Sequence, residues 1–113
     1  MNNLKFKFFI SLLITSQSMS AQKVYSVDYE SQADIKVFVV DYQSQADLNV
    51  YKVDYQSQAK GNEGLWYFVK YKSQSDKTIY FVDYKSQADL LIYFVDYKSQ
   101  SKWNKKSKKH LLH

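Results

Sequence analysis

The 113-residue chain has no cysteine, no proline and two glycines, while 45% of its residues are hydrophobic and 18% are aromatic. This composition excludes a disulfide-stapled scaffold, a flexible linker architecture and a glycine-rich calcium-binding repeat solenoid. The net charge of +5 belongs to the two ends, because residues 22–101 contain nine of the sixteen lysines and all eleven acidic residues. The central part lacks the basic face that phosphate binding requires, so we predict no nucleic-acid partner.

The first 21 residues have the pattern of a secretory signal peptide. Lys5 and Lys7 precede an apolar run over residues 8–14, and a stretch of small polar residues follows. The sequence at 18–20 offers a cleavage site before Ala21, and cleavage before Gln22 is the alternative. The apolar run is shorter than the roughly 20 residues that a transmembrane helix needs. We therefore predict export to the periplasm or the extracellular space after cleavage near residues 20–21. A buried N-terminal strand is the alternative interpretation.

An eight-residue motif, Val-Asp-Tyr-x-Ser-Gln-Ala-Asp, is repeated through most of the remaining chain. Its six copies occupy residues 27–34, 40–47, 53–60, 69–76, 82–89 and 95–102. The motif tyrosines lie 13 residues apart, except for a spacing of 16 between Tyr55 and Tyr71. The additional residues fall at 61–64, which contains both glycines, and glycine reaches positive φ without strain. A repeated unit indicates a fold built from copies of that unit. We predict one repeat domain over residues 22–102, with triplets at 24–60 and 66–102 joined by a glycine turn at 61–64.

The segments between the polar phrases have the composition of β-strands. Residues 24–29 and 79–84, for example, are rich in β-branched and aromatic side chains, so we predict an all-β domain. Alternation places Tyr25, Val27 and Tyr29, with their counterparts in other copies, on one uniform face. The opposite face is polar at mid-strand in some copies and apolar in others (Ser26 and Lys52 against Val39, Phe68, Phe81 and Phe94). We therefore expect some strands to be sandwiched and others to face solvent.

The polar segment x-Ser-Gln-Ala-Asp predicts a compact corner between strands. It is too polar for a strand and lacks the Asn-Gly or Asp-Gly of a tight hairpin, so we expect about one helical or 3-10 turn. The Asp before each tyrosine is placed so that its carboxylate accepts hydrogen bonds from backbone N–H groups two or three residues further along the chain. The recurring Ser and Gln are expected to satisfy backbone groups as well. The predicted structural corner residues are Asp28, Ser31, Gln32, Asp41, Ser44, Gln45, Asp54, Ser57, Gln58, Ser73, Gln74, Asp83, Ser86, Gln87, Asp96, Ser99 and Gln100.

The tandem units, from residue 24 to about residue 102, resemble a bacterial family of small repeat domains known as domain of unknown function family 6150. The resemblance implies a compact, pseudosymmetric β domain whose chain is tied in a seven-crossing torus knot, the septafoil. Lys70 in place of the motif Asp, and the insertion at 61–64, depart from the regular pattern. The resemblance implies a fold and no activity, because the family has no established function.

Catalysis and metal binding are not indicated. The repeats contain no His, Cys or Arg, and His110 and His113 lie outside them, whereas nucleophile–base pairs usually need such groups. A metal site made from the two aspartates of one motif is disfavoured, because three of the six copies have Lys at one of these positions. We predict no enzymatic activity, no metal and no cofactor.

We predict an exported structural or binding module of high stability that acts as a monomer. The first alternative is binding of an envelope glycan or cell-wall polymer through aromatic platforms, although rings at strand spacing favour core packing. The candidate platforms are Tyr25, Tyr51, Tyr67, Tyr80, Tyr93 and Trp66. The second alternative is a surface adhesin with amyloid-like pairing of its repeats, which the regularly spaced charges disfavour.

The C-terminal segment at 103–113 is basic, and we expect a disordered tail. Near an anionic membrane or envelope polymer, each lysine contributes about 1 kcal/mol of attraction. Lys105, Lys106, Lys108 and Lys109 would therefore give a weak contact with an anionic envelope surface.

Overall fold

A computed structural model of the chain describes residues 22–113, and the predicted signal peptide lies outside these residues. The described part contains seven strands, each followed by a short 3-10 helix. The strands are β1 (Lys23–Ser26), β2 (Ile35–Val39), β3 (Leu48–Lys52), β4 (Leu65–Phe68), β5 (Lys77–Phe81), β6 (Leu90–Phe94) and β7 (Lys102–Trp103). The 3-10 helices are η1 (Glu30–Gln32), η2 (Gln43–Gln45), η3 (Gln56–Gln58), η4 (Lys72–Gln74), η5 (Lys85–Gln87), η6 (Lys98–Gln100) and η7 (Lys106–Leu112).

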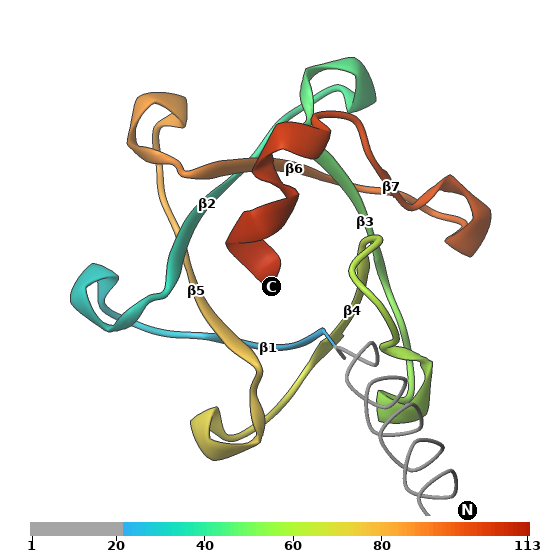
Figure 1. The fold of residues 1–113 in the computed structure, drawn as a ribbon. Coiled ribbons are helices and arrows are strands. Elements are labelled where there is room, and N and C mark those ends of the chain that lie inside the picture. The colour runs from blue at the N-terminus through green and yellow to red at the C-terminus, as the bar shows by residue number, and fades with distance from the viewer. Residues whose placement is uncertain (1–21) are drawn as a thin grey trace, which may run out of the picture.

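Strands β1 to β6 form a closed barrel in which every neighbouring pair is parallel. The order around the barrel is β1, β5, β2, β6, β3, β4, and β4 pairs with β1 again. Strand β7 lies outside this ring and pairs antiparallel with β3. Figure 1 shows the barrel along its axis, with the corners η1 to η6 projecting outward.

The chain winds around the barrel axis twice. The first triplet supplies β1, β2 and β3, which lie at every second place in the ring, and the second triplet fills the places between them. Parallel neighbours normally need a long crossover connection, often a helix. Here short corners suffice, because each strand hydrogen-bonds to strands of the other turn rather than to the next strand of its own turn.

The barrel interior is packed in layers that alternate between the two turns. In the middle layer, the first turn contributes Val24, Val37 and Val50, and the second contributes Trp66, Ile79 and Ile92, all with 0% exposure. Around the ring each valine therefore stands between two larger side chains.

The next layer towards the strand C-termini repeats this alternation. Ser26, Val39 and Lys52 are exposed, whereas the intervening Phe68, Phe81 and Phe94 are partly buried and pack against the core. The Lys52 Nζ lies 4.5 Å from the ring centroid of Phe94 and 5.5 Å from that of Phe68. The variable strand face thus reflects interleaving of two turns. It does not divide the strands into sandwiched and solvent-facing ones, which corrects that expectation.

The glycine turn at 61–64 joins the two turns of the chain. Gly61 and Gly64 have φ values of 67° and 91°, which confirms that this turn needs the left-handed region. A Cβ atom at Gly64 would collide with the carbonyl oxygen of Asn49, whereas a Cβ at Gly61 would meet nothing within 4 Å. Gly64 is therefore required for close approach as well as for backbone conformation.

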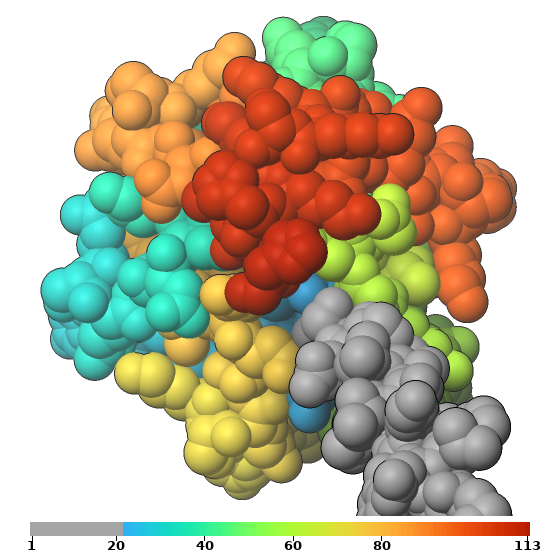
Figure 2. All heavy atoms as spheres, in the orientation of Figure 1, coloured from blue at the N-terminus to red at the C-terminus, as the bar shows by residue number. Residues whose placement is uncertain are grey.

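The C-terminal segment is ordered, and the expectation of a disordered tail at 103–113 is wrong. Figure 2 shows the C-terminal residues covering the middle of the face in view. Leu112 on η7 is 1% exposed and Trp103 is 4% exposed, and both belong to the core cluster. These apolar side chains hold the segment, while its lysines lie on the outer side or in ion pairs.

Two ion pairs and several hydrogen bonds tie this segment to the barrel. Lys108 Nζ lies 3.1 Å from Asp47 Oδ2, and Lys109 pairs with Glu63. The side chain of Asn104 donates to the oxygens of Ala46 and Asn49. Two of the lysines expected to reach an envelope surface are therefore engaged within the protein. Among the described residues, no helix is long and apolar enough to cross a membrane.

Candidate binding surface at the corners

Each of the six repeat corners is a single 3-10 turn, as predicted. The motif tyrosine stands before the turn in extended conformation, and its carbonyl accepts from the residue three positions on, for example Gln32 N to Tyr29 O at 3.0 Å. The valine two residues before each tyrosine is buried, with an exposure of 5–9% across the six copies. The chain thus leaves the barrel wall immediately after a core residue and exposes the next five residues in every copy.

The last aspartate of the motif fastens four of the corners to the neighbouring strand. Asp34 donates its backbone N–H to the Thr78 carbonyl, and its carboxylate accepts from the Thr78 N–H at 3.0 Å. Asp47 has the same pair of bonds with Leu91, Asp76 with Lys23, and Asp89 with Lys36. We call this arrangement the aspartate clasp, and in every case it links the two turns of the chain.

Sequence reasoning missed the clasps, although a signal for them was present. Lys60 and Lys102 replace the aspartate in the remaining two copies. Lys60 leads into the glycine turn and Lys102 opens the antiparallel β7, so neither corner leads directly into a regular barrel strand. Aspartate therefore occurs where a parallel strand begins after the corner, and lysine occurs where it does not.

The other corner residues make fewer bonds than expected. Gln58 and Gln100 accept from the backbone N–H groups of Tyr55 and Tyr97, each at 3.2 Å, as backbone satisfiers do. Within residues 22–113, none of the side-chain hydrogen bonds involves Asp28, Asp41, Asp54, Asp83 or Asp96, and these aspartates are exposed. The carboxylates that satisfy the backbone are those of the clasps, which corrects the capping role expected for the aspartate before tyrosine.

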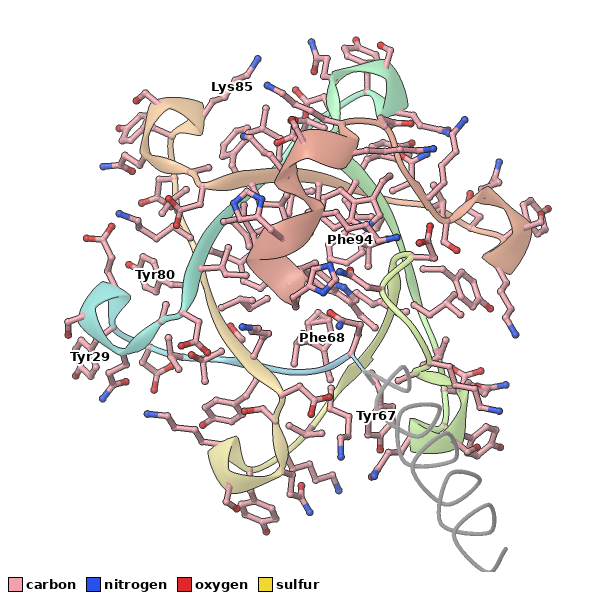
Figure 3. The ribbon with its side chains drawn as sticks, viewed as in Figure 1. Tyr29, Tyr67, Phe68, Tyr80, Lys85 and Phe94 are labelled. Atoms are coloured by element: carbon pink, nitrogen blue, oxygen red, sulfur yellow. The ribbon has the colours of Figure 1, made fainter. Side chains whose placement is uncertain are left out.

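The motif tyrosines are the most exposed large aromatic side chains of the described residues. Their exposures are nearly equal, from 66% to 68%, at Tyr29, Tyr42, Tyr55, Tyr71, Tyr84 and Tyr97. Figure 3 shows Tyr29 at the tip of its corner, directed away from the barrel. The six rings therefore form a girdle of equivalent aromatic groups around the molecule, which we call the tyrosine girdle.

The aromatic residues expected to act as platforms lie elsewhere. Trp66 is completely buried in the barrel, so it is unable to contact a ligand. Tyr25, Tyr51, Tyr67, Tyr80 and Tyr93 are half-buried along the strands. The uniform Tyr-Val-Tyr face thus divides into a half-buried ring, a buried valine and a fully projecting tyrosine.

The residue after each motif tyrosine separates the corners into two kinds. It is Glu30, Gln43 or Gln56 in the first triplet and Lys72, Lys85 or Lys98 in the second. Because the two turns interleave, lysine-bearing corners alternate with the others around the girdle (Figure 1). The charges are unevenly spread around the girdle. The neighbouring corners of residues 27–34, 82–89 and 40–47 contain seven acidic residues and one lysine, whereas those of residues 95–102, 53–60 and 69–76 contain three acidic residues and five lysines.

The corners expose polar and aromatic groups side by side. Ser and Gln side chains surround each exposed tyrosine, and hydroxyl, amide and carboxylate groups are available beside an aromatic face. Among residues 22–113, no group of three or more His, Cys, Asp or Glu side chains gathers as a metal site.

The Thr78 backbone N–H holds the pKa of Asp34 below its ordinary value of 3.8, while partial burial opposes this shift. The lowered pKa of Asp34 therefore arises from the hydrogen bond of the aspartate clasp.

A family model for the 7(1) septoil knot domain matches residues 21–104. The chain belongs to this family. The septoil knot domain covers all seven strands, so the double winding of the barrel is the family's knotted fold. A torus knot of this type runs twice around one axis, as β1 to β3 and β4 to β6 do here. Comparisons with curated proteins and with solved structures found no match.

Proposed function

We propose that this septoil knot domain is an exported, non-enzymatic binding module that holds a glycan or cell-wall polymer on the tyrosine girdle. The observation that carries the proposal is the equal exposure, 66–68%, of a tyrosine at all six corners. A tyrosine ring that is two-thirds exposed contributes little to core packing, and tyrosine is enriched at interfaces because it joins an apolar ring to a polar hydroxyl.

The unengaged polar groups beside the girdle support the same function. Sugars present hydroxyl groups around an apolar ring face, so they need an aromatic platform and hydrogen-bonding partners together. Asp28 and Ser31 flank Tyr29 without an internal hydrogen bond, and equivalent residues flank most of the other tyrosines. Six weak sites on one rigid body bind a repeating polymer more tightly than any single site would, since later contacts become intramolecular.

The alternative of an amyloid-like adhesin has less support. The hydrogen bonds of β1 to β6 close on themselves, and a closed ring of strands offers no edge for pairing with a second chain. The catalytic alternative lacks a nucleophile–base pair among the described residues, where the histidines lie only at positions 110 and 113.

Pull-down with purified cell-wall polysaccharide and a glycan array test the proposal. Replacing Tyr29, Tyr55 and Tyr84 together by alanine should reduce polymer retention at least tenfold and leave the unfolding transition unchanged. The matched control is Tyr80→Ala, a half-buried tyrosine of β5, which should lower stability and retain binding in the folded fraction. Equal retention by the triple variant and the native protein would contradict a role for the girdle.

Export is tested separately by fractionation of cells that express the full chain. The mature protein should appear outside the cytoplasm with its N-terminus near residue 21 or 22. A cytoplasmic, uncleaved chain would contradict the export part of the proposal and leave the binding test intact.

A further inference from the structure

The C-terminal helix η7 is attached to the barrel through two buried carboxamides. The amide nitrogen of Gln22 donates to the carbonyl of Leu112 at 3.1 Å, and that of Asn62 donates to the carbonyl of Lys109 at 3.0 Å. Lys109 and Leu112 are three residues apart, and positions i and i+3 share one face of a 3-10 helix. Both carboxamides therefore hold the same face of η7.

Among the described residues, three buried side-chain polar atoms lack a hydrogen-bond partner within the protein, and two of them belong to the carboxamides that hold η7. They are the side-chain oxygens Gln22 Oε1 and Asn62 Oδ1, and the indole nitrogen Trp66 Nε1. Their residues are 1%, 7% and 0% exposed. Leaving such a group unpaired costs about 1–3 kcal/mol, so each of the three calls for a partner from outside the chain.

Strand pairing brings these residues to one seam. Lys23 on β1 lies opposite Tyr67 on β4, and the Tyr67 N–H donates to the Gln22 carbonyl at 3.0 Å. Gln22 therefore lies beside Trp66, and both precede by two residues an inward-facing side chain of their strand. Asn62 reaches the same region, because its carbonyl accepts from the Trp103 indole at 2.7 Å and its amide binds η7.

We propose that this seam is a binding site for one small molecule that donates two hydrogen bonds and accepts one, and that in the protein as purified the molecule is water. The two carboxamide oxygens only accept hydrogen bonds, and the indole N–H only donates. Water supplies two donors and an acceptor, which complements this set. An ammonium ion lacks the acceptor and a simple anion lacks the donors, so these classes do not fit.

The bound water links the barrel wall to the C-terminal segment and is independent of the tyrosine girdle. Buried waters occur about once per 27 residues and usually make about three hydrogen bonds, so a body of this size is expected to hold a few. At this seam the water joins β1, the glycine turn and β4 under η7. It completes the attachment that the two carboxamides begin.

The test is water–protein NMR on the native protein with both indole N–H groups assigned. The Trp66 indole proton should give a cross-peak to water with the sign of a long-lived bound molecule. The Trp103 indole, which donates directly to Asn62, should give none. Absence of the Trp66 cross-peak would overturn the proposal.

A pair of variants sharpens the result. Gln22→Met removes the Oε1 acceptor, and with it the Nε2 bond to Leu112, while keeping a side chain of similar length. It should abolish the Trp66 cross-peak or weaken it at least threefold. Asn104→Ala removes hydrogen bonds of the C-terminal segment outside the seam, to Ala46 and Asn49, and should leave the cross-peak intact. A cross-peak of native strength in Gln22→Met would contradict the three-partner site.

Discussion

The two turns of this chain are built from the same repeat, and their differences show how near-identical units pack around one axis. The middle layer of the barrel takes three valines from the first turn and Trp66, Ile79 and Ile92 from the second. The neighbouring layer takes Ser26, Val39 and Lys52 from the first turn and three phenylalanines from the second. Six large side chains would overfill such a ring and six small ones would leave a cavity, since interiors are packed at crystal-like density. In the middle layer, alternation of valine with larger side chains is how the ring is filled.

The turns also depend on each other through the aspartate clasps. Asp34 and Asp47 of the first turn bind strands of the second, while Asp76 and Asp89 of the second turn bind strands of the first. Neither turn has these partners alone, so the first triplet is not expected to fold by itself.

The largest effect is expected from the second-turn side chain that fills the most space. Trp66→Ala should destabilise the protein by roughly 3–5 kcal/mol, because it leaves a large cavity at a completely buried site. The matched first-turn variant Val50→Ala should cost roughly 2 kcal/mol, because fewer buried atoms are removed. Denaturant unfolding measures both, and equal losses would mean that the two turns do not divide the core as described.

The second largest loss of stability is expected in the glycine turn at 61–64, which joins the two turns of the chain. Gly64→Ala should cost roughly 3 kcal/mol, because positive φ and a collision with the Asn49 carbonyl act together. Gly61→Ala is the control, since it carries only the backbone penalty of about 1–2 kcal/mol. If Gly61→Ala and Gly64→Ala lowered stability equally, the collision of a Cβ at Gly64 with the Asn49 carbonyl would not contribute to the loss.

A clasp links the turns more weakly than the core does. Asp89→Ala should destabilise the protein by about 1 kcal/mol, because it removes the acceptor of the Lys36 N–H. Asp83→Ala, in the same corner and without a hydrogen bond, should change stability by less than about 0.5 kcal/mol. The difference between the unfolding midpoints of these two variants measures how much the Asp89 clasp stabilises the protein. Equal midpoints would contradict a stabilising role for this clasp.

The Asp34 clasp predicts the direction of a pH effect. Its pKa is lowered in the folded state, mainly by the Thr78 backbone N–H, so its stabilisation is fully present above the unfolded pKa near 3.8. This stabilisation is lost as the pH falls through the lower, folded pKa. Urea unfolding between about pH 2 and pH 5 should show a smaller acid-induced loss of stability in Asp34→Asn than in the native protein. An unchanged slope would argue against the clasp.

The smallest effect is expected at the girdle. Tyr42→Ala from the first turn and Tyr84→Ala from the second should each change stability by less than about 0.5 kcal/mol, since both rings are about two-thirds exposed. Thermal unfolding measures the stability of both variants. A large loss of stability in either variant would mean that the motif tyrosines stabilise the fold.

Strand composition, corner positions and the glycine turn could be predicted because they depend on local properties. β-branched and aromatic runs favour strands, polar phrases favour turns, and the two glycines mark the left-handed positions at 61 and 64. The clasps were not predicted, because the partner of Asp34 lies 44 residues away. The C-terminal segment was misjudged from its lysines, although Trp103, Leu111 and Leu112 already offered apolar side chains for burial.

By itself the sequence determined a six-fold repeat of strand and corner, its division into two triplets, and the absence of disulfides. Only the tertiary structure decided that the second triplet lies between the strands of the first, which makes their side chains complementary in size. It also decided which aspartate binds the backbone, which tyrosine reaches solvent, and where the basic C-terminus packs. These outcomes depend on the register between segments far apart in the chain, and a repeat carries the same local information in every copy.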